Sequence, residues 1–415
     1  MKRLFNFVWI FLITLTMCTC AFSTSIFAAG FEDSGEYKRY KKDNGEYAYS
    51  EFVEDNRKIY YINENGYKTV KSWVVIGDDF YYAASDGEIY RDGPHLIDDN
   101  TFYFGVDGKL VKGWINDIYY ANEDGYLVDG FQQLEVPKNW YRSEIDEDKE
   151  EAWFYFNPST HKKVYAEYDE YATKTIGNAK YCFDANGMLC TGWRKIKDDE
   201  EPAIKGYMYF AEEKIDDFKF GEALYNTWYT TEPPVELLPN SQVQFFYFGP
   251  NGQPRCANQE GGYLKVRIGT KTYLFNEYGF TVHGIRKIGN DYYYFGPSEK
   301  DCSMKTGMQT ELDGLGNTIH YYFADDGVGY TGIHNNKLYY KGLLQKASPG
   351  NKYEAFNVQG IERLVNSEGV VQKNKKRVKD ANGVIWSTNA SGVVIYTDEG
   401  EAQDPELPVP EDDFH

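Results

Sequence analysis

Side chains that could perform catalysis are scattered along this 415-residue chain. The histidines do not cluster, and none lies in an HExxH zinc-peptidase motif. No GxSxG nucleophile motif and no paired-cysteine metal spacing is present. Ser159 and Lys162 match the letters of an SxxK motif, but they follow Asn157-Pro158, which predicts a turn. We therefore expect no catalytic residue, no enzymatic activity, no metal and no cofactor. The histidines are His95, His161, His283, His320, His334 and His415.

Two cysteines have a spacing that suits a local bridge. Cys182 and Cys190 flank the turn sequence DANG and could face one another across a hairpin, which would permit a disulfide. Two free, half-buried thiols are the alternative. Acidic turns such as 122–125 have oxygen ligands that could bind Ca²⁺, although ordinary turn chemistry explains them without a metal.

The most informative pattern is a recurring frame of aromatic residues and glycines. Two aromatics are followed by a turn glycine six residues after the first of them. A second glycine lies five residues further on, followed by a bulky apolar residue. The complete copies are 102–114, 119–131, 181–193, 273–285 and 321–333, and the first half alone recurs at Tyr60/Gly66, Tyr81/Gly87 and Phe246/Gly252. A repeat of this kind dictates the architecture.

The frame predicts short β-strands joined by tight turns. Aromatic residues favour strands, and Asp-Gly or Asn-Gly pairs supply the positive φ angles of hairpin turns. We expect each copy to be a hairpin of about twenty residues, with its second strand between the two glycines. A lone hairpin is barely stable in water, so hairpins must stack on their neighbours. The predicted fold class is therefore all-β: a β-solenoid of stacked ~20-residue hairpin repeats with irregular insertions, in which the bulky residue reaches the next repeat.

Composition and charge narrow the function classes. The formal net charge is −20, which repels nucleic acid and anionic lipid. Lys2, Arg3, an apolar run to residue 17 and small residues up to residue 30 predict a signal peptide over 1–29. A retained membrane anchor is the alternative, although the apolar run is short for a span. We expect a secreted protein with no nucleic-acid partner and no membrane insertion after signal removal.

The spacing of the frame also predicts how the chain is organised. The expected segments are a signal peptide (1–29), an N-terminal cap (30–57), a first repeat block (58–134), an insertion with a degenerate hairpin (135–178), a repeat (179–194), a second insertion (195–244), a second repeat block (245–341), degenerate C-terminal repeats or a cap (342–398) and a disordered acidic tail (399–415).

The repeated frame resembles the cell-wall-binding repeats of Gram-positive secreted proteins, also called choline-binding or glucan-binding repeats, and is similar to the carbohydrate-binding repeats of clostridial toxins. This resemblance covers about 60–333. It implies an extracellular β-solenoid associated with the cell wall or cell surface. It also implies attachment to wall polysaccharide or to choline-decorated teichoic acid, without catalysis. A host-glycan adhesin, or a structural surface protein without a small ligand, is the alternative. A wall hydrolase with its active site in an insertion is a further one.

The resemblance also implies ligand sites made of aromatic rings, because an aromatic cage attracts a quaternary ammonium ion by cation–π interaction. The expected pairs are Trp73 with Tyr82, Trp114 with Tyr120, and Trp193 with Tyr181. The position before the aromatic pair lacks the tryptophan of a full cage in this chain. Stacking on a sugar face needs fewer rings, so a glycan or a mixed wall polymer is favoured over free choline.

Overall fold

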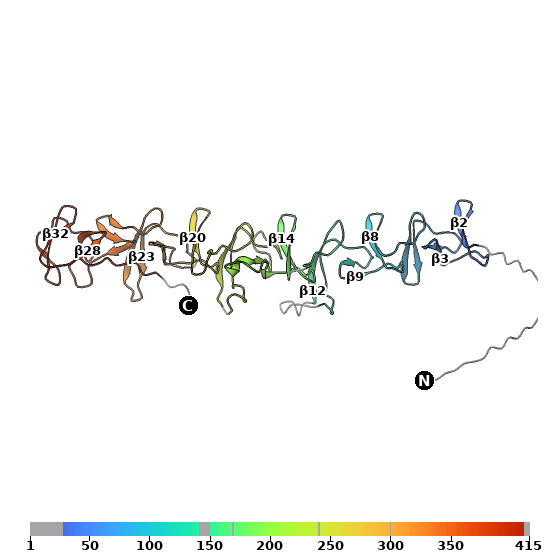
Figure 1. Cartoon of the computed structure of the whole chain (residues 1–415), viewed down its shortest axis with the longest axis horizontal. Coiled ribbons are helices and arrows are strands. Elements are labelled where there is room, and N and C mark those ends of the chain that lie inside the picture. Colours follow the sequence, from blue (N-terminus) through green and yellow to red (C-terminus); the bar gives the residue numbers. More distant parts are fainter. Residues whose placement is uncertain (1–27, 141–149, 168–169, 240, 299, 411–415) are drawn as a thin grey trace, which may run out of the picture. The chain divides into compact units, whose positions relative to one another are not determined.

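The computed structural model describes residues 28–140, 150–167, 170–239, 241–298 and 300–410. Short antiparallel hairpins recur through these ranges (Figure 1). The only helical element in them is a 3-10 turn, η1 (Ala203–Gly206). The all-β prediction is therefore confirmed. No helix in the described part of the chain is long and apolar enough to span a membrane. Residues 1–27 of the predicted signal peptide (1–29) lie outside the described part of the chain.

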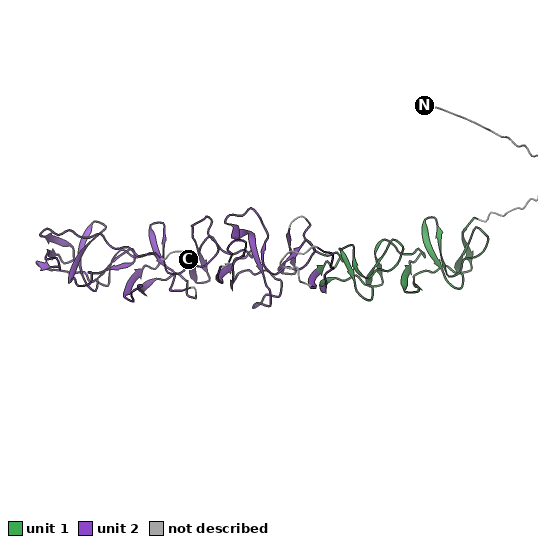
Figure 2. Ribbon diagram, turned by 90° about the horizontal axis from the view of Figure 1, so that it is seen from below, with its two compact units in different colours: residues 1–132, 155–163 green, residues 133–154, 164–415 purple. Residues whose placement is uncertain are grey.

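The chain divides into two compact units (Figure 2). Unit 1 comprises Met1–Gln132 and Tyr155–Lys163, and unit 2 comprises Gln133–Phe154 and Val164–His415. Unit 1 contains β1 (Gly30–Ser34), β2 (Tyr37–Lys41), β3 (Glu51–Asp55), β4 (Lys58–Ile62), β5 (Ser72–Ile76), β6 (Asp79–Ala83), β7 (Gly93–Ile97), β8 (Asn100–Phe104), β9 (Gly113–Ile115) and β10 (Tyr119–Ala121). The strands β11 (Gly130–Glu135) and β12 (Glu151–Phe156) each have residues in both units.

Unit 2 contains the remaining strands. They are β13 (Tyr171–Ile176), β14 (Ala179–Asp184), β15 (Gly192–Lys195), β16 (Tyr207–Phe210), β17 (Thr227–Thr231), β18 (Gln244–Phe248), β19 (Leu264–Ile268), β20 (Lys271–Phe275), β21 (Ile285–Ile288), β22 (Asp291–Tyr294), β23 (Gly307–Leu312), β24 (Thr318–Phe323), β25 (Gly332–His334), β26 (Lys337–Tyr340), β27 (Leu343–Gln345), β28 (Tyr353–Val358), β29 (Ile361–Asn366), β30 (Val378–Lys379), β31 (Ile385–Thr388) and β32 (Val394–Thr397).

Each hairpin begins one strand earlier than the sequence suggests. In β5–β6, Trp73 pairs with Tyr82, and a two-residue turn at Gly77 and Asp78 joins the strands. The aromatic pair thus lies on the second strand of its hairpin. For the complete copies of the frame, the prediction that the turn after the aromatic pair joins the two strands is wrong. In those copies the turn leads instead into an isolated bridge, such as that between Phe104 and Leu110. The turn that contains Asn382-Gly383, by contrast, does join two paired strands, β30 and β31.

The reason for this shift is that the segment after the turn lies between two hairpins. The N–H of Leu110 donates to Phe80 O of the preceding hairpin at 2.8 Å, while the next N–H, of Val111, donates to Tyr103 O of its own hairpin at 2.9 Å. The segment therefore shares its backbone hydrogen bonds between the two and cannot pair as a full strand with either.

The bond to the preceding hairpin recurs along unit 1. In every case the donor is the residue two positions after the turn glycine. Its acceptor is the carbonyl of a residue on the second strand of the preceding hairpin. The donor–acceptor pairs, each at 2.8 Å, are Lys68 N–Lys38 O, Ile89 N–Ile59 O, Leu110 N–Phe80 O and Leu127 N–Thr101 O. These bonds satisfy backbone groups that would otherwise be left at a strand edge.

The turns themselves are held by a side-chain oxygen. At the first turn position, Asn122 Oδ1 accepts the N–H of Tyr126 at 2.9 Å, and Asp184 Oδ1 accepts that of Met188 at 2.7 Å. Asn276 and Asn366 do the same with the residue four positions on. Asn and Asp are favoured at such positions because their short side chains reach the backbone of the turn.

The core contains a series of aromatic rings at or next to the last strand position before the turn. Seven of these rings are fully buried: Phe104, Phe156, Phe183, Phe210, Phe248, Phe275 and Phe323. In three repeats of unit 1 a smaller buried residue has this position: Ile62, Ala83 and Ala121. The bulky residue after the second glycine packs on the next repeat, as predicted. Ile285, for example, is buried in a cluster with Tyr321 and Phe323.

Two predicted segments differ from the structure. The region 195–244, predicted to be an insertion, contains η1, β16, β17 and the first residue of β18. The acidic tail was predicted to be disordered from residue 399, yet its described part up to 410 is docked on unit 2. Gln403 N donates to Ala355 O at 2.8 Å, and Glu406 exchanges two hydrogen bonds with the buried side chain of Gln345.

Candidate aromatic binding site

Trp73 is the centre of a set of rings in unit 1. It lies on β5 directly opposite Tyr82 on β6, and the two ring centroids are 5.2 Å apart at an interplanar angle of 74°. From the next hairpin, Phe102 approaches Trp73 edge-to-face at 5.0 Å and Phe104 lies at 6.1 Å. Such edge-to-face contacts are favoured by the ring quadrupole. We call this arrangement a ring set: a tryptophan, the tyrosine opposite it, and the aromatic residues of the next hairpin.

Three further tryptophans form ring sets of the same kind. Trp114 lies opposite Tyr120 (5.3 Å) and contacts Phe156 (6.0 Å). The other two sets are Trp193 with Tyr209 (5.4 Å), Phe246 (5.2 Å) and Phe248 (5.5 Å), and Trp228 with Tyr247 (4.9 Å), Tyr273 (4.7 Å) and Phe275 (5.9 Å). The recurring register of the hairpins places these side chains together.

The structure brings together two of the three predicted pairs, Trp73 with Tyr82 and Trp114 with Tyr120. The third pair is different. The residue opposite Trp193 is Tyr209, whereas Tyr181 lies on β14 of the preceding hairpin and its hydroxyl donates to Glu222 Oε1 at 2.9 Å. The long loop that contains η1 separates Trp193 from its partner strand, β16. Trp193 therefore pairs with an aromatic residue that follows it in the sequence, Tyr209, and not with one that precedes it.

Trp228 was missed in the sequence because it lacks a glycine directly before it and, unlike Trp73, also lacks a nearby aromatic pair after it. Asn226, two positions before Trp228, has the positive φ (49°) that a glycine would otherwise provide. The turn is therefore not marked by a glycine in the sequence. A long connection then separates Trp228 from the aromatic run 245–248. The first half of the frame at Phe246/Gly252 was the available signal, since a tryptophan strand precedes other copies of that half-frame.

The four ring sets differ in how open they are. Trp73 is 37% exposed, whereas Trp114, Trp193 and Trp228 are half-buried. The indole N–H of Trp193 already donates to Glu232 O at 2.8 Å. Phe245 stacks on Trp228 at 4.6 Å with an interplanar angle of 13°. Trp73 therefore presents the most accessible ring face of the four.

A polar hollow lies beside the Trp73 ring set. Tyr82 stacks on Tyr90 at 5.5 Å, and Tyr90 stacks on His95 at 4.1 Å with an interplanar angle of 13°. Tyr90 and His95 line a hollow of about 700 Å³. The charged side chains at its wall are those of Asp86, Glu88, Arg91 and Asp92.

The acidic wall of this hollow is ordered by Lys58. The ammonium of Lys58 lies 2.6 Å from Glu88 Oε2 and 3.4 Å from Asp86 Oδ2. Asp86 Oδ1 accepts a hydrogen bond from the backbone N–H of Glu88 at 3.0 Å. This bond lowers the pKa of the Asp86 carboxyl, and the nearby ammonium of Lys58 lowers it further. Asp86 is therefore ionised at neutral pH and can accept hydrogen bonds from hydroxyl groups.

The cysteines in unit 2 are buried thiols. Cys182 and Cys190 are neighbours across the turn, and Cys190 N donates to Cys182 O at 2.9 Å. Both are free, so the disulfide expected as one alternative is not present. A hydrogen bond with Cys190, together with burial, raises the pKa of the Cys182 thiol. Such a thiol is a packing group and a poor nucleophile.

In the described residues, no group of three or more His, Cys, Asp or Glu side chains is arranged to hold a metal ion. The acidic turns considered for Ca²⁺ use their side-chain oxygens within the turn. Asn122 Oδ1, for instance, accepts the N–H of Tyr126.

Comparison with known proteins gives relatives from streptococci. No family model matches the chain. The chain is 25% identical to glucosyltransferase-I of Streptococcus downei in a 338-residue match that covers 78% of this chain and 19% of the relative. It is 27% identical to glucosyltransferase-S of Streptococcus mutans in a 174-residue match that covers 34% of this chain and 12% of the relative. The chain thus spans about a fifth or less of the length of these curated relatives.

Solved structures from Streptococcus pneumoniae also match. CbpJ covers 78% of this chain and 99% of its own length at 20% identity and a TM-score of 0.41. Choline binding protein F covers 83% of this chain and 98% of its own length at 19% identity and a TM-score of 0.39. The resemblance to the cell-wall-binding repeat family, which the repeated frame predicts, is confirmed.

Proposed function

We propose that this protein is a secreted, non-catalytic module that attaches to wall polysaccharide or to choline-decorated teichoic acid at the cell surface. The ligand is held at aromatic sites between hairpins, of which Trp73 is the principal one. The observation that carries the proposal is the exposed face of Trp73, in a ring set that adjoins the acidic hollow lined by Tyr90 and His95.

The exposure of the individual rings favours a sugar over free choline at this site. A box for a quaternary ammonium ion needs several ring faces open to the ligand. In the Trp73 set, Tyr82 and Phe102 are only 8% and 7% exposed, so one ring face is available. A pyranose needs one such face for stacking, and the ionised Asp86 carboxylate provides an acceptor for its hydroxyls. A glycan part of the wall polymer is therefore the preferred ligand.

We further infer that the hairpins of each unit stack as a β-solenoid. The recurring N–H···O bond from each turn to the preceding hairpin supports this arrangement in unit 1. In unit 2, Ala223 N donates in the same way to Lys180 O at 2.8 Å. Strands of two hairpins occupy the segment 195–244, which supports a non-catalytic role for that region.

The test is a pull-down on purified Gram-positive cell walls with the secreted protein and two variants. We expect Trp73→Ala to lose most of its wall retention. Trp153→Ala is the matched control, because Trp153 is also 37% exposed but belongs to none of the ring sets. Equal retention of Trp73→Ala and wild type would refute Trp73 as the principal site.

Two further arms of the same experiment identify the ligand. Retention on walls stripped of teichoic acid supports a glycan or peptidoglycan ligand and excludes teichoic choline. Loss of retention on stripped walls, or elution by millimolar choline, supports choline-decorated teichoic acid. Failure of wild type to bind any wall preparation would refute the attachment function.

A further inference from the structure

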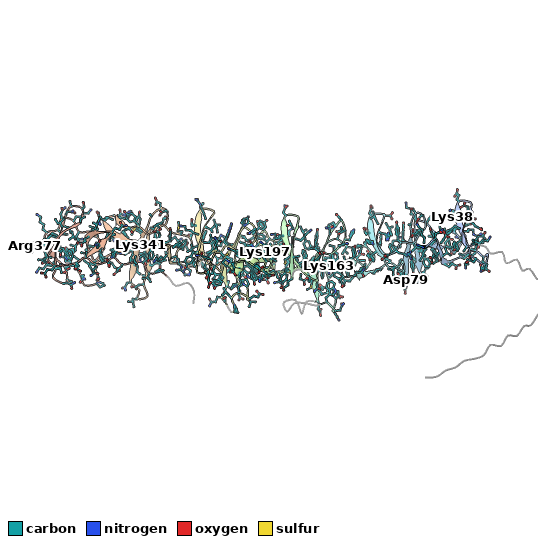
Figure 3. All side chains as sticks on the ribbon, in the orientation of Figure 1. Lys38, Asp79, Lys163, Lys197, Lys341 and Arg377 are labelled. Atoms are coloured by element: carbon teal, nitrogen blue, oxygen red, sulfur yellow. The ribbon has the colours of Figure 1, made fainter. Side chains whose placement is uncertain are left out.

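A lysine of the chain itself lies over the second ring set. The ammonium nitrogen of Lys163 is 5.2 Å from the centroid of the Trp114 ring (Lys163 is labelled in Figure 3). The side chain is almost completely buried, at 5% exposed. Its backbone is fixed on both sides: Lys163 N donates to Ile118 O at 2.8 Å, and Lys163 forms an isolated bridge with Phe156.

In the other ring sets, the position equivalent to Lys163 holds an apolar or small residue. It is the residue that comes after the turn of the next hairpin and bonds back to the hairpin of the tryptophan. In the Trp73 set this residue is Leu110, whose N–H donates to Phe80 O. In the Trp228 set it is Thr281, whose N–H donates to Phe245 O at 3.3 Å. Only at Trp114 among these sets does the position hold a cation.

Burial of an ammonium group is costly unless other groups replace its water. A ring face within about 6 Å provides part of that replacement, and the attraction strengthens when the pair is desolvated. Among aromatic side chains, the indole of tryptophan, here that of Trp114, attracts a cation most strongly. The same face is the one that an external quaternary ammonium ion would use.

We propose that Lys163 is an internal ligand of the Trp114 ring set. Its ammonium occupies the cation position over Trp114 and closes this site to external cations. The lysine is therefore a specificity-determining residue of the array. This inference refines the proposed function, because it explains why the ring sets of one protein are not equivalent as binding sites.

The same device is present elsewhere in the chain. Lys68 places its ammonium 5.1 Å from the ring centroids of both Phe31 and Tyr60. Lys265 lies 4.2 Å from the centroid of Tyr293 on the next hairpin. Lys265 is opposite Leu274 on β20, at the strand position that Trp73 has in its own hairpin. Lysines of the chain thus occupy ring faces at three separate repeats.

The decisive variant is Lys163→Leu, which copies the residue found at Leu110. Choline chloride is titrated into the full-length variant and into wild type, and the number of bound choline molecules is measured by calorimetry. In the Trp114 set both Trp114 and Tyr120 are half-buried, so two ring faces are available once the ammonium is removed, whereas Tyr82 of the Trp73 set is buried. We therefore expect the variant to bind one more choline per chain than wild type, and Lys163→Leu/Trp114→Ala to lose the gain. Lys162→Leu is the control, since Lys162 is exposed and is expected to change nothing. No gain in Lys163→Leu would overturn the inference.

The result is independent of the wall-binding proposal. A choline gain in Lys163→Leu supports the internal ligand even if wild type retains no wall polymer. Conversely, wall retention through Trp73 without a gain in Lys163→Leu refutes the internal ligand alone.

A second measurement does not depend on the folding of the leucine variant. Lysine acylation followed by peptide mass spectrometry compares Lys163 with the adjacent, exposed Lys162. We expect Lys163 to be protected in wild type and in Trp73→Ala, and to react in Trp114→Ala. Equal reactivity of the two lysines in wild type would overturn the inference, as would continued protection of Lys163 in Trp114→Ala.

Discussion

Gln345 and Glu406 are 61 residues apart in sequence but bind each other through two hydrogen bonds in unit 2. Glu406 N donates to Gln345 Oε1 at 2.8 Å, and Gln345 Nε2 donates to Glu406 O at 3.0 Å. The amide side chain of Gln345 is 1% exposed. It satisfies the backbone of the tail in the way a neighbouring strand would, and this is why the acidic tail docks in spite of its composition.

Substitution of Gln345 by alanine is expected to destabilise the docked tail. A buried backbone group left without a partner costs about 1–3 kcal/mol. The free energy of unfolding from urea titration and the rate of proteolysis within 399–410 measure the effect. Gln309→Ala is the control, because its side chain bonds at an exposed site and should change stability by no more than about 0.5 kcal/mol. Unchanged proteolysis of the tail in Gln345→Ala would contradict the expectation.

The tryptophans of the ring sets should differ in their contribution to stability. Trp228 has ring contacts with Phe245, Tyr247, Tyr273 and Phe275 and is half-buried. Its replacement by alanine should cost up to about 3–5 kcal/mol, the range for fully buried Trp→Ala changes. Trp73→Ala should cost less, because Trp73 is partly solvated already. Urea unfolding of both variants checks the order, and a larger loss for Trp73→Ala would show that the exposed ring is mainly structural.

Two glycines of neighbouring turns provide a test of close packing. Gly289 and Gly296 both have positive φ, 62° and 72°. A Cβ at Gly289 meets no atom, whereas a Cβ at Gly296 would overlap the carbonyl oxygen of Asp301. Gly289→Ala should cost about 1–2 kcal/mol from the left-handed backbone alone. Gly296→Ala should cost about 1–3 kcal/mol more, because the Asp301 backbone must move. Equal unfolding midpoints for the two variants would argue against this packing.

Stability should fall in alkali. Burial raises the pKa of the Cys256 thiol to about 11, and burial together with the Glu222 carboxylate raises the pKa of the Tyr181 hydroxyl. In the unfolded chain these groups ionise near their ordinary values, about 8.5 for Cys and about 10 for Tyr. The unfolded chain therefore loses protons first as the pH rises, and the stability present below about pH 8 declines through pH 9–11.

Urea unfolding at pH 7, 9 and 10.5 measures this decline. Tyr181→Phe cannot ionise at this position, so its stability should fall less steeply between pH 9 and 10.5 than that of wild type. A parallel pH dependence in both proteins would show that Tyr181 does not contribute.

The sequence predicts the strands and turns well because the repeated frame encodes them locally. Asn and Asp at the turn start, glycine at the positive φ, and aromatics on the strand are all short-range signals. The hairpin register was predicted incorrectly, because Leu110 divides its backbone bonds between two hairpins. A single repeat does not show which neighbour a segment will pair with.

The candidate site was predictable where its members are close in sequence. Trp73 with Tyr82, and Trp114 with Tyr120, are separated by a tight turn. The partners of Trp193 and Trp228 could not be inferred in this way, because long loops separate each tryptophan from its partner strand. These loops are the one that contains η1 and the one between β17 and β18. Lys163 gives no local signal at all, because its contact with Trp114 depends on how two hairpins pack.

Because each turn bonds to the hairpin before it in the same way, the repeats of unit 1 are equivalent building blocks. Tyr60, Tyr81 and Phe102 are 21 residues apart, so an unequal recombination that gains or loses 21 codons would restore the same bond at the new junction. Energetic coupling in such an array extends only to adjacent members. Array length, and with it the number of open and lysine-filled ring faces, could therefore evolve by duplication and deletion without redesign of the rest.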